Sequence, residues 1–284
     1  GEGAPLAAIE AALRADQAGR IKAVLATHNE TATGVRSDIA GIRRAMDAAG
    51  HGALLFVDGV SSIGSMPFEM AGWGVDIAVA GSQKGFMLPA GLAILGVSDK
   101  ALAAMEGATL PRTFFDFRDM LKSYAAGGYP YTPAVGLISG LAKAVEMLED
   151  EGLEAVYARH ARLAEGVRRA VAAWGMKPCA VSPELYSDTV TAVVVPAGCN
   201  GTDLVKLAAD KYGVAFGVGL GEVAGKVFRI GHLGMLTDVM VLAGLATAEM
   251  CMADLGWPVK LGSGVAAAQE FYRGNAGTMA LAAE

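Results

Sequence analysis

Short apolar runs and amphipathic segments alternate along the first third of the chain. The apolar runs are rich in Val, Ile, Leu and Ala, and they cover residues 21–26, 53–57, 75–80 and 92–97. Residues 5–18 and 37–49 instead have their apolar positions at helical spacing. This order predicts an α/β fold with a mainly parallel sheet covered by helices on both faces. The connection before 92–97 is short, so the last strand is free to run antiparallel.

The second half of the chain predicts a smaller α/β unit. Two helical segments, 134–149 and 152–173, are separated at Gly152. Beyond them, the pattern predicts strands at 189–195 and 226–230, and helices at 202–211, 237–254 and 264–273. We therefore predict a domain boundary near residue 150, with residues 1–150 in a large domain and residues 151–284 in a small C-terminal domain.

Residues 112–133 interrupt this alternation. They combine glycine with several aromatic side chains, which predicts a loop over a site or a subunit contact. The stretch 239–248 is the longest apolar run, but Glu249 ends it well short of the length that spans a bilayer. It is therefore predicted to be a buried helix, and no membrane partner is expected.

Composition and charge narrow the class of protein. Of the 284 residues 53% are hydrophobic and 18% are charged, which is typical of a globular protein. The formal net charge of −6 argues against nucleic acid as a partner, because such proteins carry basic surfaces. The three cysteines are an odd number without paired spacing, which favours a reduced, cytoplasmic setting.

Polar side chains follow three of the apolar runs at the point where each run ends. Thr31 lies in the segment after the first run, Asp58 follows the second, and Gly81-Ser82-Gln83-Lys84 follows the third. Ligands of open α/β sheets bind at this end of the strands. A lysine against apolar walls can lose its proton and form a Schiff base, an aspartate can keep a ring nitrogen protonated, and a hydroxyl can bind a phenolic oxygen. These three groups together suit pyridoxal 5'-phosphate.

Each of these residues also has an ordinary structural interpretation. Lys84 could be a solvated loop lysine, since most lysines stay exposed. Asp58 could be a turn residue, because Asp-Gly is a turn pair, and the Thr31 hydroxyl could form a local turn. His28 and Glu30 lie two residues apart, which is not a metal-ligand spacing, so no metal is predicted and His28 is interpreted as structural.

Five ordered motifs resemble the class V aminotransferases of fold type I, and the serine–glyoxylate and aspartate–glyoxylate branch in particular. They are His28–Val35, Val57–Gly64, Gly81–Lys84, Tyr129–Pro133 and Phe228–Gly234. The resemblance covers residues 1–273. It implies a large domain that binds pyridoxal 5'-phosphate, a smaller C-terminal α/β domain, and a homodimer.

The resemblance also implies a role for each matching residue. Lys84 and Asp58 are the catalytic pair, and both bind the cofactor together with Thr31, Ser82 and Gln83, the last two at its phosphate. Tyr129 and Thr132 match positions that reach the cofactor of the neighbouring subunit, although a surface turn would explain them too. Arg229 matches the residue that binds the substrate carboxylate through its planar fork, the alternative being an arginine on an edge strand. Arg112 and Arg118 are candidates for a second carboxylate, and the role of His232 is open.

The activity that this branch implies is transamination of glyoxylate to glycine. L-Serine, which would give hydroxypyruvate, is the predicted amino donor, followed by L-aspartate or L-alanine. One alternative is a lyase similar to cysteine desulfurase, which would need a nucleophilic cysteine, and Cys199 precedes Arg229 in the sequence. Another alternative is a truncated, catalytically silent chain. Family members carry about a hundred further residues ahead of Gly1, less than one typical domain, with a glycine-rich phosphate loop and a stacking aromatic residue.

Overall fold

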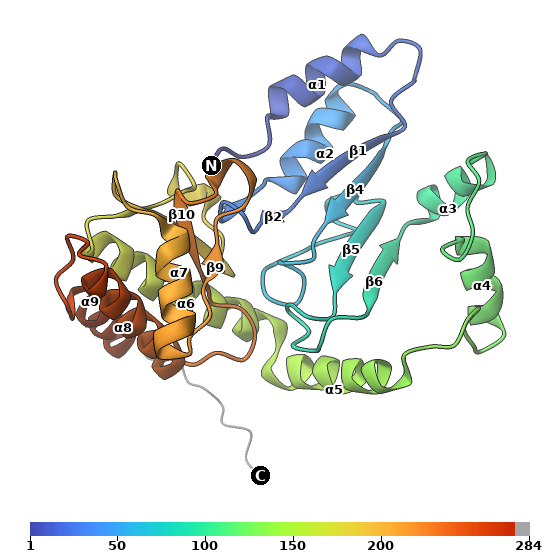
Figure 1. Ribbon diagram of the computed structural model, residues 1–284. Coiled ribbons are helices and arrows are strands. Elements are labelled where there is room, and N and C mark those ends of the chain that lie inside the picture. The colour runs from blue at the N-terminus through green and yellow to red at the C-terminus, as the bar shows by residue number, and fades with distance from the viewer. Residues whose placement is uncertain (276–284) are drawn as a thin grey trace.

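The computed structural model describes residues 1–275 and contains two separate four-stranded sheets (Figure 1). The N-terminal sheet consists of β1 (Ala23–Thr27), β4 (Leu54–Asp58), β5 (Ile77–Gly81) and β6 (Ala93–Val97), in the order β1-β4-β5-β6. The first three strands are parallel and β6 runs antiparallel to β5. This sheet confirms the predicted mainly parallel arrangement and the direction left open for the last strand.

Two helices cover one face of this sheet. They are α1 (Leu6–Ala15) and α2 (Ile39–Ala48). Their apolar residues form a core with alternate residues of β4, because side chains along a strand point to opposite faces. On the other face Leu25 is 77% exposed and Leu95 is 40% exposed. Among the described residues, α1 and α2 therefore cover one face of the sheet. The prediction of helices on both faces is met on that face only.

A short hairpin leaves the carboxyl end of β1 and reaches the C-terminal half of the chain. Its strands are β2 (Asn29–Glu30) and β3 (Val35–Arg36). Gly34 has a φ of 68°, and a Cβ there would lie 3.0 Å from the carbonyl oxygen of Val190. Both the backbone conformation and the close approach require glycine, so this position fixes the hairpin against the second sheet.

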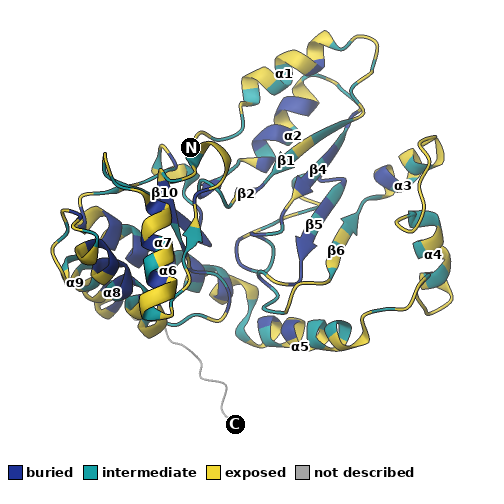
Figure 2. Ribbon diagram, in the orientation of Figure 1, coloured by how far each residue is buried: buried dark blue, intermediate teal, exposed yellow. Residues whose placement is uncertain are grey.

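A mostly exposed arm follows β6. It contains α3 (Asp99–Glu106) and α4 (Phe117–Ala125), and it leads into α5 (Val135–Glu151), which runs along one end of the N-terminal sheet (Figure 1). The prediction of a loop over 112–133 is wrong for α4, which Asp116 caps by accepting a hydrogen bond from the Arg118 N–H at 3.0 Å. No residue of α4 is buried (Figure 2).

The second sheet lies among the C-terminal helices. Its four strands are antiparallel. Their order across the sheet is β7 (Lys177–Pro178), β8 (Val190–Val194), β10 (Val227–Gly231) and β9 (Gly217–Val218). The helices are α6 (Leu153–Ala173), α7 (Gly201–Tyr212), α8 (Asp238–Asp254) and α9 (Ser263–Gly274), with short 3₁₀ turns η1 (Pro183–Leu185) and η2 (Gly221–Val223). In α8, Leu245 is fully buried but Val239 is 74% exposed, so the predicted buried helix is buried along one side only.

The two sheets have separate hydrophobic cores on either side of residue 150. This separation supports our proposal of two domains that meet where Gly152, with a φ of 82°, divides α5 from α6. Residues 276–284 of the predicted C-terminal domain lie outside the described residues. Within the described part of the chain, no helix combines the length and the apolar character needed to cross a bilayer.

Candidate active site

Three loops meet at the carboxyl ends of the parallel strands. The register places Thr27 beside Asp58, and Asp58 beside Val79. Past the strands, the His28 N–H donates to the Asp58 carbonyl oxygen and the Gly59 N–H donates to the Val79 carbonyl oxygen, each at 2.9 Å. The segments that carry Thr31, Asp58 and Lys84 therefore start from one edge of the sheet, as the sequence predicts.

Lys84 lies in a tight loop three residues after β5. The loop is closed by hydrogen bonds from the Met87 N–H to the Lys84 carbonyl oxygen and from the Leu88 N–H to the Ser82 carbonyl oxygen, at 2.9 and 3.0 Å. Lys84 is half-buried, and its Nζ makes no hydrogen bond or ion pair with the described residues. Its amine therefore makes no bond within the described residues that would stabilise the fold.

Asp58 is the last residue of β4, and its side chain is exposed. Its Oδ1 accepts a hydrogen bond from the Val60 N–H at 2.9 Å, so part of the structural interpretation as a turn residue is correct. The turn after Asp58 touches the lysine loop, because a Cβ on Gly85 would collide with the carbonyl oxygen of Ile63. The carboxylate and the amine thus lie on backbone segments in direct contact.

Arg229 connects the second sheet to the hairpin that carries Thr31. Its Nη1 donates to the Thr31 carbonyl oxygen at 2.9 Å and its Nε donates to the Val218 carbonyl oxygen at 2.8 Å. These bonds fix the guanidinium plane and leave three of its five N–H groups without a partner among the described residues, enough for the bidentate pairing that a carboxylate can make. Arg229 belongs to β10, which pairs with strands on both sides, so the alternative of an edge-strand arginine is wrong.

Gly217 is a site residue that the sequence did not reveal. It pairs with Arg229 across β9 and β10. A Cβ at Gly217 would lie 3.0 Å from Nε of Arg229 and 3.2 Å from its Cζ. The missing side chain therefore leaves space for the guanidinium group, and only the strand register indicates this.

Ser82 and Gln83 differ in their surroundings. Ser82 is fully buried, and its hydroxyl donates to the Pro89 carbonyl oxygen at 2.8 Å and accepts from the Leu92 N–H at 3.1 Å. Gln83 is exposed. The Ser82 hydroxyl therefore shapes the lysine loop, and the assignment of both side chains to a phosphate stays a prediction that is better supported at Gln83.

Tyr129 and Thr132 lie in the exposed connection between α4 and α5, and Tyr129 is 61% exposed. Among the described residues, no hydrogen bond joins either side chain to Lys84, Asp58 or Thr31. Their predicted contact with a neighbouring subunit remains a prediction.

Arg112 and Arg118 are held within the same arm. Arg112 pairs with Asp116 at 3.1 Å, and Arg118 donates to the Met105 carbonyl oxygen at 2.9 Å. The structure does not bring either arginine to Arg229 or Lys84. Their predicted role at a second carboxylate therefore gains no support.

Two buried histidines lie beside the site without contributing charge. Burial lowers the pKa of His28 to about 4 and the pKa of His232 to about 3, so both are neutral at physiological pH. His28 Nδ1 hydrogen-bonds the Ser62 hydroxyl at 2.8 Å, and His232 Nε2 hydrogen-bonds the Thr191 hydroxyl at 2.9 Å. These contacts support the structural interpretation of His28 and favour the same interpretation for His232.

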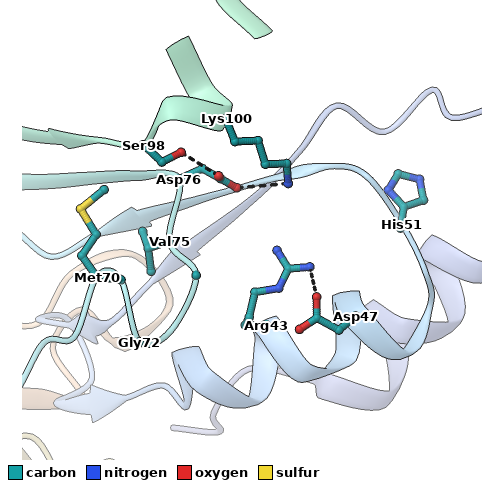
Figure 3. Close-up of a pocket in the computed structure, with 11 residues that line it drawn as sticks. Arg43, Asp47, His51, Met70, Gly72, Val75, Asp76, Ser98 and Lys100 are labelled. Atoms are coloured by element: carbon teal, nitrogen blue, oxygen red, sulfur yellow. Dashed lines mark hydrogen bonds and ion pairs between the residues drawn. The ribbon is translucent and has the colours of Figure 1, made fainter. Parts of the chain in front are cut away.

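A cavity of about 670 Å³ lies at the opposite, amino ends of the parallel strands (Figure 3). At this end of the sheet, Asp76 connects neighbouring segments. Its carboxylate accepts hydrogen bonds from the Leu55 N–H at 2.9 Å and from the Ser98 hydroxyl at 2.8 Å. The cations on the cavity wall already have carboxylate partners: Arg43 pairs with Asp47, and Lys100 pairs with Asp76. We therefore assign this cavity a structural role.

Cys199 lies in the loop between β8 and α7 and packs against the C-terminal hydrophobic core. A nucleophile for desulfurase chemistry would have to be exposed near Lys84 and Arg229. The position of Cys199 therefore gives the lyase alternative no support.

Comparisons with known proteins match nearly the whole chain. The family model for aminotransferase class-V matches residues 6–232. The chain is 67% identical over 273 residues to L-aspartate–glyoxylate aminotransferase of Paracoccus denitrificans (strain Pd 1222), covering 96% of this chain and 69% of that protein. It is 54% identical over 278 residues to serine–glyoxylate aminotransferase of Hyphomicrobium methylovorum, covering 97% and 69%. The crystal structure of pyridoxamine–pyruvate aminotransferase from Mesorhizobium loti matches with a TM-score of 0.89 at 34% identity, covering 97% of this chain and 70% of that one.

Proposed function

Because this chain belongs to the class-V aminotransferase family, we propose that it transfers the amino group of a small amino acid to glyoxylate and forms glycine. The fold is that of fold type I enzymes, and the protein is an aminotransferase that depends on pyridoxal 5'-phosphate. The observation that carries the choice of glyoxylate is the high identity to two glyoxylate aminotransferases.

For the amino donor we propose L-aspartate ahead of L-serine, which reverses the order predicted from the sequence. The reason is the difference in identity, 67% to the aspartate–glyoxylate enzyme against 54% to the serine–glyoxylate enzyme. L-Alanine is third. All three donors carry the α-carboxylate that we assign to Arg229.

The residues at the sheet edge fit the cofactor by the chemistry of their groups. Lys84 offers an amine without a hydrogen-bond or ion-pair partner among residues 1–275, and Asp58 has an exposed carboxylate. Thr31 and Gln83 supply a hydroxyl and an amide on the neighbouring loops. We propose that Lys84 holds the aldehyde and that Asp58 holds the ring nitrogen. Thr31 would then hold the phenolic oxygen, and Gln83 the phosphate. When bound, pyridoxal 5'-phosphate supplies an electron sink for the bond that breaks at the donor's α-carbon.

Three residues of the chain would carry out the other steps of the reaction. Arg229 binds the α-carboxylate and thereby orients the α-carbon toward the lysine loop. The Nζ of Lys84, once released, takes the proton from that carbon and later returns one, acting as general base and then general acid. The carboxylate of Asp58 holds a proton at the ring nitrogen, because its negative charge stabilises the protonated form.

We also propose that the enzyme is a homodimer in which the exposed arm contacts the neighbouring site. In the arm, α4 buries none of its residues, and Tyr124, Tyr129 and Phe115 are 81%, 61% and 74% exposed. Exposed aromatic side chains gathered on one segment favour a protein interface. Tyr129 and Thr132 would then reach the partner's cofactor.

The proposed reaction is tested by incubating the purified protein with pyridoxal 5'-phosphate, glyoxylate and one donor at a time. We expect glycine to form fastest with L-aspartate, then with L-serine, then with L-alanine. Release of sulfide from L-cysteine without glycine formation would support the lyase instead. No turnover with any donor would favour the hypothesis of a silent chain.

Arg229→Lys is expected to raise KM for glyoxylate and for the amino donor together, by about tenfold, because lysine keeps the charge but loses the bidentate fork. Steady-state kinetics with both substrates measure this. Arg36→Lys is the matched control, since Arg36 also links the two halves of the chain, donating to the Glu184 carbonyl oxygen, but lies outside the proposed site. A defect with one donor alone would mean that Arg229 binds a side chain.

A further inference from the structure

A buried cluster of polar side chains joins the two halves of the chain next to the candidate site. Its central members are Asn29, Ser61 and Thr189, which are 3%, 6% and 2% exposed, and the buried Ser187 hydroxyl lies 3.2 Å from that of Thr189. Asn29 belongs to β2, Ser61 to the turn after β4, and Thr189 directly precedes β8. Side chains from three distant parts of the sequence therefore meet out of contact with solvent.

The hydrogen bonds of the cluster have a consistent direction. The Asn29 Nδ2 donates to the hydroxyl oxygens of Ser61 and Thr189, both at 2.9 Å. The Ser61 hydroxyl donates to the Asn29 carbonyl oxygen at 2.8 Å, and the Thr189 hydroxyl donates to the Ser61 carbonyl oxygen at 3.0 Å. Each hydroxyl both donates and accepts, so the three side chains are held in one arrangement.

Each member of the cluster is close in sequence or in register to a proposed site residue. Asn29 precedes Thr31 by two residues, and Ser61 follows Asp58 by three. Thr189 leads into β8, which pairs with the strand of Arg229. A change in the cluster would therefore shift the cofactor loops relative to the strand that carries the arginine.

The cluster leaves one polar atom unsatisfied. The Asn29 Oδ1 is buried and has no hydrogen-bond partner among the described residues. Burying these polar side chains costs desolvation free energy, which their hydrogen bonds offset only in part. Polar groups that are kept at such a cost favour a role in geometry over a role in stability alone.

We propose that Thr189 is a positioning residue, whose hydroxyl sets the separation between Asp58 on one side and Arg229 on the other. The inference rests on the proposed function, since it assumes that Arg229 binds the substrate carboxylate. A substrate anchored at Arg229 must present its α-carbon to Lys84. Small displacements between an anchor and a reacting group reduce the rate strongly.

The test compares Thr189→Val, which keeps the shape of the side chain but removes the hydroxyl, with Thr189→Ser, which keeps the hydroxyl. We expect the valine variant to lose about 10- to 100-fold in kcat/KM for glyoxylate and for the amino donor alike, mainly through KM. The affinity for pyridoxal 5'-phosphate should stay unchanged, because Thr189 directly precedes β8 and belongs to none of the three loops that we assign to the cofactor. Thr189→Ser should restore the wild-type KM values.

Thr247→Val is the matched control. Thr247 is a buried residue of α8 whose hydroxyl donates to the Ala243 carbonyl oxygen, so the variant also loses one buried hydrogen bond, but far from the cluster in sequence. It should lose stability without a change in KM. Wild-type KM values in Thr189→Val, an equal rise in Thr247→Val, or failure of the serine variant to restore KM would each overturn the inference.

Hydrogen exchange provides a readout that needs no turnover. The Ser187 N–H donates to the Gly34 carbonyl oxygen at 3.0 Å and so reports on the same junction. Its exchange should be faster in Thr189→Val than in wild type, and unchanged in Thr247→Val. Unchanged exchange at Ser187 in Thr189→Val would overturn the inference whatever the activity. If the wild type does not transaminate glyoxylate, the proposed function fails, and this measurement still shows whether the Thr189 hydroxyl holds the two halves of the chain together.

Discussion

Replacing Lys84 with alanine is expected to lower the rate of transamination by about 10⁴-fold or more, because the variant loses both the amine that binds the cofactor and the base that moves the α-proton. The structure supports a large effect on activity with a small effect on folding. Nζ of Lys84 makes no hydrogen bond or ion pair with the described residues, so its removal leaves no buried partner unsatisfied.

The measurement combines kinetics with chemical labelling. Reduction of the cofactor-loaded enzyme with borohydride, followed by peptide mapping, should find the cofactor fixed to Lys84. Lys100→Ala is the control, because Lys100 binds the Ala53 carbonyl oxygen and Asp76 at the opposite end of the sheet and should affect stability rather than turnover. A label on Lys22, Lys100 or Lys122 would show that the assignment of Lys84 is wrong.

Asp58→Asn is expected to lower kcat by about 10³-fold while the fold is retained, because an amide cannot supply the negative charge that keeps a proton on the ring nitrogen. The hydrogen bond that Oδ1 accepts from the Val60 N–H can be preserved by the amide oxygen. The turn after β4 should therefore keep its conformation, and the loss should appear in kcat rather than in the thermal midpoint.

Turnover and thermal unfolding of the Asp58 variant should be measured beside those of Asp38→Asn. Asp38 also accepts a backbone hydrogen bond, from the Gly41 N–H at 2.7 Å, but it caps α2 away from the three loops. Asp38→Asn should leave kcat unchanged. If Asp58→Asn turns over like the wild type, Asp58 is a turn residue and nothing more.

The parts of the fold that could be predicted depend on local patterns. The apolar runs located all four strands of the N-terminal sheet, and three of the four runs also contribute residues to its buried core. The hairpin of β2 and β3 escaped prediction, since strands of two residues have no periodicity to detect. Helix α4 was not predicted either. The glycine and aromatic residues around it are typical of a loop, and they outweighed the signal of Asp116 as a helix cap.

In the candidate site too, the features that follow from local sequence patterns could be predicted, and those that depend on distant contacts could not. Lys84 and Asp58 follow apolar strands, so their common edge could be predicted from the order of the elements. The anchoring of Arg229 by two backbone carbonyl oxygens could not, because it depends on the register of β9 and on a contact with the distant residue Thr31. The same holds for the two hydrogen bonds that occupy the Ser82 hydroxyl.

The hydrogen bond between Thr31 and Arg229 also bears on how the chain folds. It joins residues 198 positions apart, and the bond between Asn29 and Thr189 spans 160 positions. Closing such long loops is slow and entropically costly, whereas the N-terminal sheet needs contacts only between neighbouring segments. We therefore expect the lysine and aspartate loops to form early and the carboxylate anchor to form last. A partly folded chain could then hold the cofactor residues in place and still be unable to select a substrate.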